Sequence, residues 1–134
     1  MSEPHPRYTI EIANMPPGLE RYTMRVLEGH IGRKAAIARD ELLKRVREMP
    51  GCSTASDRQI RAAINTLRKS GQAICSAGGE DGGYWLAEDW AELSEYMERE
   101  LHSRAMDLLE QEKALKASAE QRWGQYSKQY GLGL

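Results

Sequence analysis

Hydrophobic residues recur at helical spacing in two stretches of the first half of the chain. The first runs from Leu19 to Ile31, and the second starts at Asp40 and ends before Pro50. In both, apolar side chains return every three or four residues, as they do along one face of an α-helix. We therefore expect a helix in each stretch, with one side buried.

A third helix is predicted to begin at Asp57. Ser56 stands where an N-cap is expected, and Gln59 follows three residues later, which is the spacing of a capping box. The apolar residues of the stretch fall on one face, and Gly71 stands where a helix ends in a left-handed residue. These apolar residues are Ile60, Ala63, Ile64 and Leu67.

Two short β-prone runs follow, Gln72–Ser76 and Tyr84–Ala87, around a glycine-rich segment. This arrangement predicts a β-hairpin. Alternation places Tyr84 and Leu86 on one face and Trp85 on the other, and at least one face must close the core. We also expect Trp90 and Leu93 to pack there.

The N-terminal segment gives a weaker pattern. Residues Tyr8–Ile12 alternate between apolar and polar side chains and are followed by Pro16, Pro17 and Gly18. Alternation indicates a short strand, and the prolines and glycine break it off. We expect residues 1–18 to form an N-terminal arm, in which residues 8–12 form either a short strand or an ordered segment.

Residues 89–123 contain no proline or glycine and predict one long helix, about 50 Å in length. Such a helix must extend beyond a domain of this size. Its apolar stripe favours pairing with the same helix of a second subunit, that is, a homodimer. The residues expected to form that interface are Leu93, Met97, Leu101, Leu108 and Leu115. The alternatives are a kink, or a solvated tail from about Gln111; residues 124–134 are expected to be a flexible tail.

Helices followed by a glycine-tipped hairpin predict a mainly α (α+β) fold, a winged helix-turn-helix over residues 19–88. The segments Ser56–Arg61, Leu67–Gly71, Ile74–Ser76 and Gly82–Ala87 resemble small winged-helix proteins of phages and prophages. Their DNA-binding part is similar to the N-terminal domain of biotin-operon-type repressors. The resemblance covers residues 19–90 and implies the fold first, and DNA-binding regulation of transcription or replication second.

Charge is distributed unevenly along the chain, although the formal net charge is only −1. Residues 21–72 hold twelve basic and five acidic side chains, whereas residues 73–134 hold six basic and twelve acidic ones. A basic block beside an acidic one is typical of a protein with a polyanion-binding surface. A chance mixture of solvated charged faces gives the same numbers.

The side of the third helix opposite its apolar stripe carries side chains suited to double-stranded DNA. Arginine pairs with guanine and asparagine with adenine, while alanine permits close approach. The candidate DNA-binding residues on this helix are Arg58, Arg61, Ala62, Asn65, Thr66, Arg68 and Lys69. Arg33, Lys34 and Arg39, around the second helix, are candidates for phosphate contacts. An ordinary solvated helix face is the alternative.

The predicted hairpin tip departs from the winged-helix pattern because it carries Glu80 and Asp81. Wings that contact DNA normally offer arginine or lysine, since carboxylates repel phosphates. Either this wing points away from DNA, or the fold binds and inhibits a host protein complex. A third hypothesis, RNA or single-strand binding through Tyr84, Trp85 and Trp90, has less support.

No pattern for catalysis or a cofactor accompanies these features. The three histidines lack metal-ligand spacing, and the glycine-rich segment lacks the lysine of a phosphate-binding loop. We expect no enzyme activity, metal or cofactor. With 134 residues, no signal-peptide pattern at Met1–His5 and no long apolar run, the chain predicts one cytoplasmic domain with extensions, in which Cys52 and Cys75 are free thiols.

Overall fold

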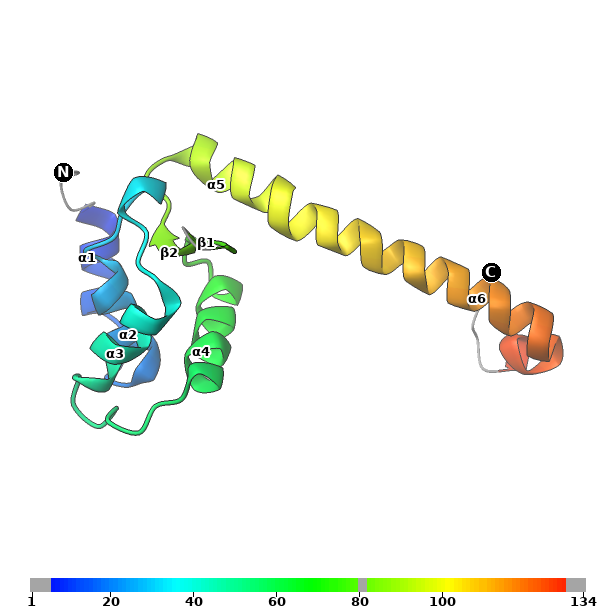
Figure 1. Ribbon diagram of the computed structural model, residues 1–134, viewed down its shortest axis with the longest axis horizontal. Coiled ribbons are helices and arrows are strands. Elements are labelled where there is room, and N and C mark those ends of the chain that lie inside the picture. Colours follow the sequence, from blue (N-terminus) through cyan, green and yellow to red (C-terminus); the bar gives the residue numbers. More distant parts are fainter. Residues whose placement is uncertain (1–5, 80–81, 130–134) are drawn as a thin grey trace. The chain divides into compact units, whose positions relative to one another are not determined.

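The computed structural model describes residues 6–79 and 82–129. The chain divides into two compact units, residues 1–94 and 95–134. The described residues are mainly helical, with one two-stranded antiparallel sheet and a long C-terminal helix (Figure 1). The mainly helical fold class with a hairpin and a long terminal helix is thus confirmed.

The two predicted helices of the first half are present as α2 (Leu19–Leu27) and α3 (Arg39–Arg47). Helix α2 packs against both α3 and α4 and is the centre of the N-terminal unit. Its buried side chains include Met24 and Leu27, which are fully inaccessible to solvent. The amphipathic pattern of the sequence therefore becomes the hydrophobic core of this unit.

Helix α4 (Asp57–Lys69) begins and ends as the sequence predicts. The Ser56 side chain accepts a hydrogen bond from the Gln59 amide, and the Gln59 side chain accepts one from the Ser56 amide, which completes the capping box. At the other end, Gly71 has a φ of 99°. The amides of Gly71 and Gln72 donate to the carbonyls of Arg68 and Leu67, the two hydrogen bonds of a Schellman motif.

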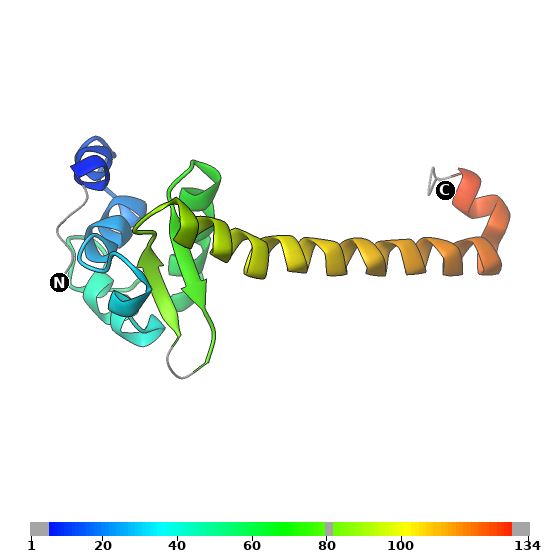
Figure 2. The same ribbon diagram turned by 90° about the horizontal axis from the view of Figure 1, so that it is seen from above.

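The predicted hairpin consists of β1 (Ile74–Ala77) and β2 (Gly83–Leu86), paired so that Cys75 lies opposite Trp85. Figure 2 shows the two strands side by side. The segment between α2 and α3 pairs with β2 through bridges of Ile31 to Leu86 and of Ile37 to Tyr84. This segment contains the 3-10 turn η1 (Arg33–Ala35) and acts as a third, irregular edge of the sheet.

Both faces of β2 are buried, whereas the sequence pattern required only one. Tyr84 and Leu86 belong to the main core, and Trp85 on the other face is only 2% exposed. The Arg33 guanidinium lies 5.8 Å from the centre of the Trp85 ring. An aromatic strand covered on both sides anchors the hairpin firmly to the N-terminal unit.

The N-terminal segment contains a helix, α1 (Pro6–Ala13), so the short strand predicted for it is wrong, whereas the alternative of an ordered arm is not contradicted. Tyr8 and Ile12 lie four residues apart on the buried side, while Ile10 is 62% exposed. The alternation of the sequence was misleading because two of the three apolar residues also satisfy helical spacing. The Tyr8 hydroxyl donates a 2.8 Å hydrogen bond to the Ala87 carbonyl, which ties α1 to the end of the hairpin.

The C-terminal part is helical from Trp90 onward, in three sections: α5 (Trp90–Tyr96), the π-helical turn η2 (Met97–His102) and α6 (Ser103–Gln129). Non-helical backbone angles at Trp123 kink α6. The long helix predicted over residues 89–123 is confirmed. Residues 124–129 are also helical, which corrects the flexible tail predicted for them; residues 130–134 lie outside the described part.

One expectation about the apolar residues near the start of this helical part needs correction. Trp90, expected in the core, is 70% exposed. Leu93, expected both in the core and in a dimer interface, and Met97, expected in that interface, are half-buried in the single chain, and the interface itself stays a prediction. The exposed part of the predicted stripe therefore begins at Leu101.

Candidate nucleic-acid interface

Helix α4 presents a continuous polar face opposite its buried stripe. Ile60, Ala63, Ile64 and Leu67 are buried, as the periodicity predicts. The structure brings six of the predicted residues together on the opposite side, where all are exposed. These are Arg58, Arg61, Ala62, Asn65, Thr66 and Lys69. Figure 1 shows α4 at the edge of the N-terminal unit, with α2 and α3 to one side of it.

Two positively charged side chains of this face, those of Arg58 and Lys69, do not stabilise the fold through ion pairs with other described residues. No ion pair within residues 6–79 and 82–129 involves Arg58 or Lys69, and no hydrogen bond of Asn65's side chain occurs there. Arg58 and Lys69 are eleven positions apart, or about 16 Å along the helix. Ala62 and Asn65 lie between them, so the face offers a small residue and an amide flanked by two positive charges.

Two other arginines of α4 have partners within the N-terminal unit. Arg61 forms a 3.0 Å ion pair with Asp57 one turn away. Arg68 is half-buried and donates to the Ile74 carbonyl at 2.8 Å and to the Ser76 hydroxyl at 3.0 Å. Arg68 therefore joins α4 to β1, a role that the sequence did not reveal because it depends on where the strand lies in space.

The basic residues predicted to contact phosphates outside α4 lie on other elements. Arg33 and Lys34 are exposed in η1, and Arg39 is exposed at the start of α3. Arg33 and Lys34 line one hollow together with Glu88 and Glu92, and the Arg33 amide donates to the Glu92 carboxylate at 3.3 Å. Nearby carboxylates reduce the positive potential there, so α4 is the stronger candidate surface.

The acidic hairpin tip of the sequence analysis, Glu80 and Asp81, lies outside the described residues. Gly83, at the start of β2, is a nearby position whose residue type the fold requires. A Cβ atom at this position would overlap the Ile37 carbonyl oxygen. Glycine at residue 83 thus permits the close approach of the 31–37 segment to β2.

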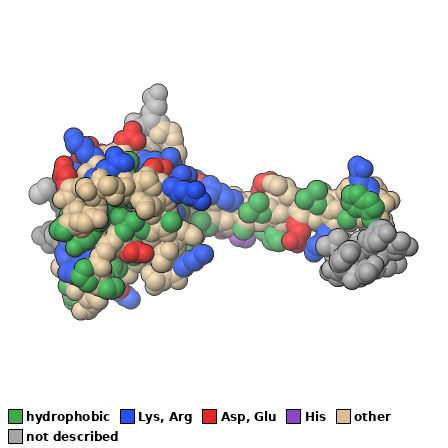
Figure 3. Space-filling view, turned by 90° about the horizontal axis from the view of Figure 1, so that it is seen from below, with side chains coloured by type: hydrophobic (Ala, Val, Ile, Leu, Met, Phe, Trp, Pro, Cys, Tyr) green, Lys and Arg blue, Asp and Glu red, His purple; other side chains and the backbone are tan. Residues whose placement is uncertain are grey.

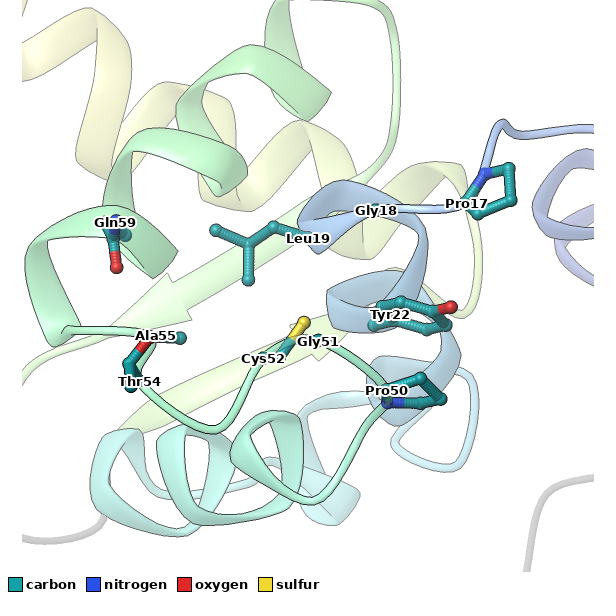
Figure 4. A pocket seen from close by; sticks show the side chains of 10 residues that line it. All are labelled: Pro17, Gly18, Leu19, Tyr22, Pro50, Gly51, Cys52, Thr54, Ala55 and Gln59. Atoms are coloured by element: carbon teal, nitrogen blue, oxygen red, sulfur yellow. The ribbon is translucent and has the colours of Figure 1, made fainter.

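A cavity beside the start of α2 contains one of the cysteines (Figure 4). The sulfur of Cys52 points into the space between Leu19 and Tyr22. The lining residues include no histidine, acid, lysine or arginine, so no neighbour in this cavity can act as a base for the thiol. Cys52 and Cys75 are both buried, free thiols.

Among the described residues, no group of three or more histidine, cysteine and acidic side chains is placed to hold a metal ion. The Nδ1 atom of His30 lies 2.7 Å from the Ala35 carbonyl oxygen, to which it donates, and so supports the η1 turn. No helix in this part of the chain combines the length and the apolar character required to cross a membrane.

No protein-family model, curated protein or solved structure matches the chain. The candidate interface therefore stands on the geometry of α4 and its neighbours alone.

Proposed function

We propose that the N-terminal unit is a winged-helix domain that binds double-stranded DNA, with the exposed face of α4 in the major groove. The order of elements supports this proposal: α2, the bridging segment 31–37, α3, α4 and a hairpin occur in the order of a winged helix. The single observation that carries it is the face of Arg58, Ala62, Asn65 and Lys69, which is exposed and is not used to hold the fold.

The dimensions of this face fit a DNA groove. An α-helix with its side chains is about 10–12 Å across, and the major groove is about 12 Å wide. The ~16 Å between Arg58 and Lys69 corresponds to about five base pairs at 3.4 Å each. One helix can therefore contact a short run of base edges along its whole length.

Each side chain of the face has a distinct role in this proposal. Arg58 pairs with guanine through its forked guanidinium, and Asn65 with adenine through its amide. Ala62 lets the helix backbone approach the bases, and Lys69 neutralises a phosphate. The resemblance to phage and prophage winged-helix proteins favours a role in the control of transcription or replication.

Electrophoretic mobility shifts with random and palindromic duplexes at two salt concentrations test the proposal. We expect binding to both classes that weakens steeply between about 50 and 200 mM salt, because counterions are released on phosphate contact. A complete lack of salt-sensitive duplex binding would contradict the proposal. It would leave inhibition of a host protein complex, and the less supported binding of RNA or single strands, as the remaining hypotheses.

A further inference from the structure

The long helix exposes a row of leucines at a spacing of seven residues. Leu101, Leu108 and Leu115 are 44%, 56% and 69% exposed. Ala105, Glu112 and Ala119 alternate with them at spacings of four and three. These six residues, which we name the leucine face, fall on one side of the helix. Figure 3 shows hydrophobic side chains on the surface of the helix between charged ones.

We propose that a second copy of this chain covers the leucine face and that the two helices run antiparallel. The leucine face has the seven-residue period of a coiled coil, in which a helix pairs with another of the same period. Its residues divide into two rows: one row is all leucine, and the other contains alanine and glutamate. This division decides the direction of pairing.

Packing favours the antiparallel direction. When parallel helices pair in register, each layer joins identical residues, so alanine meets alanine and leaves a gap. When the helices run antiparallel about residue 110, Leu115 meets Ala105 of the second copy and Leu101 meets Ala119. In these layers each leucine lies opposite an alanine, which fills the space between the helices evenly.

Charge favours the same direction. Parallel pairing places Glu112 directly against Glu112 of the second copy, and two like charges at one layer repel each other. Antiparallel pairing places Glu112 opposite Leu108 and separates the two carboxylates. The Lys116 ammonium, 3.4 Å from the Glu112 carboxylate in the same chain, compensates that charge at the edge of the interface.

A further exposed leucine finds a partner only in the antiparallel pair. Leu109 is 56% exposed and borders the leucine face. In the antiparallel arrangement it lies beside its own copy across the twofold axis. In a parallel pair its neighbour is Arg104 of the second copy, which leaves the leucine beside a charge.

The arrangement sets the separation of the two points at which the C-terminal unit, residues 95–134, starts. With the twofold axis near residue 110, the two Glu95 positions are about 45 Å apart along the helix axis. A parallel pair would bring these points together. Because the leucine face covers fewer than three heptads, we expect association to depend on protein concentration.

Sedimentation of the full chain, without DNA, tests whether the face self-associates. We expect the wild-type protein to dimerise and Leu108→Glu to be monomeric. Met106→Glu is the matched control, because Met106 is exposed, at 45%, but lies off the leucine face. This variant should still dimerise. A monomeric wild-type protein, or a dimer unaffected by Leu108→Glu, would overturn the proposal.

Disulfide trapping then tests the direction. The Ala105→Cys variant is mixed with a mass-tagged Leu115→Cys variant under mild oxidation, with circular dichroism to verify that both remain helical. We expect a disulfide between the two variants, because antiparallel pairing places residue 105 opposite residue 115 of the second copy. Two copies of the same variant should not cross-link, since residues 105 and 115 of one chain are about 15 Å apart along the axis and two identical positions are separated by that distance. Disulfides that join two chains of the Ala105→Cys variant would demonstrate a parallel pair and overturn the proposal. Both measurements are independent of DNA binding, so their outcome and that of the proposed function are separable.

Discussion

The Tyr8 hydroxyl and the Ala87 carbonyl oxygen are 2.8 Å apart, although the two residues are separated by 79 positions in the sequence. This hydrogen bond joins the first helix to the end of the hairpin. Tyr8 is 9% exposed, and burial raises the pKa of its hydroxyl from 10.0 to about 12. The helix α1 is therefore an integral part of the N-terminal unit.

Replacing Tyr8 with phenylalanine should lower the free energy of unfolding by about 1–2 kcal/mol, because the buried Ala87 carbonyl loses a hydrogen-bond donor. Urea denaturation followed by circular dichroism measures this change. Tyr22→Phe is the control, since the Tyr22 hydroxyl makes no hydrogen bond within the described residues. Equal stability of Tyr8→Phe and the wild type would show that the bond contributes nothing.

The same hydroxyl predicts a pH effect with a definite sign. Its pKa is higher in the folded protein than in the unfolded chain, so the folded state binds more protons above pH 10. The contribution of Tyr8 is complete below pH 10 and should be lost between pH 10 and about 12. The stability difference between wild type and Tyr8→Phe should therefore shrink over this range. A constant difference would contradict the assignment.

Gly83→Ala should destabilise the N-terminal unit by about 2 kcal/mol or more, because the new methyl group overlaps the Ile37 carbonyl. The bridge between Ile37 and Tyr84 would have to open. Thermal denaturation measures the effect. Gly78→Ala is the matched control in the same hairpin, since no atom lies within 4 Å of its added Cβ. Equal melting temperatures for the two variants would refute the close approach.

Local signals in the sequence were sufficient to predict α4 and the hairpin. The capping box at Ser56 and Gln59, the stripe that ends at Leu67 and the glycine at residue 71 all act within a few residues of one another. Such features define where a helix begins and ends without reference to distant residues. The exposed face of α4 follows directly, because a helix with one buried side must expose the other.

The remaining features depend on contacts between distant segments and leave no local pattern. Arg68 has the same charge as its neighbour Lys69, yet it binds β1 while Lys69 is exposed. Trp85 is buried on the face that alternation left open, and Arg33, distant in the sequence, lies over its ring. The helical state of residues 6–13 depends on the core that accepts Tyr8 and Ile12. None of these partners is identifiable from the residues beside them in the chain.

Arg58→Ala combined with Asn65→Ala should remove sequence preference for DNA and leave non-specific binding, since each paired base contact contributes about 1–3 kcal/mol of discrimination. Selection of bound fragments from a genomic library measures this preference. Lys69→Ala provides the contrast: it should weaken binding to all sequences alike and reduce the salt slope by about one. Unchanged preference in the double variant would show that α4 does not contact the bases.

The central claim is that the exposed face of α4 lies against DNA, and Ala62 occupies the middle of that face. The most direct measurement is the duplex affinity of Ala62→Glu, by fluorescence anisotropy at low salt, beside that of Ala117→Glu. Ala117 is an exposed alanine of α6 and gives the same change in charge. We predict at least a roughly tenfold loss of affinity for Ala62→Glu, from repulsion of phosphates and lost approach to the bases, and near wild-type affinity for Ala117→Glu. Equal affinity of the two variants would contradict the account.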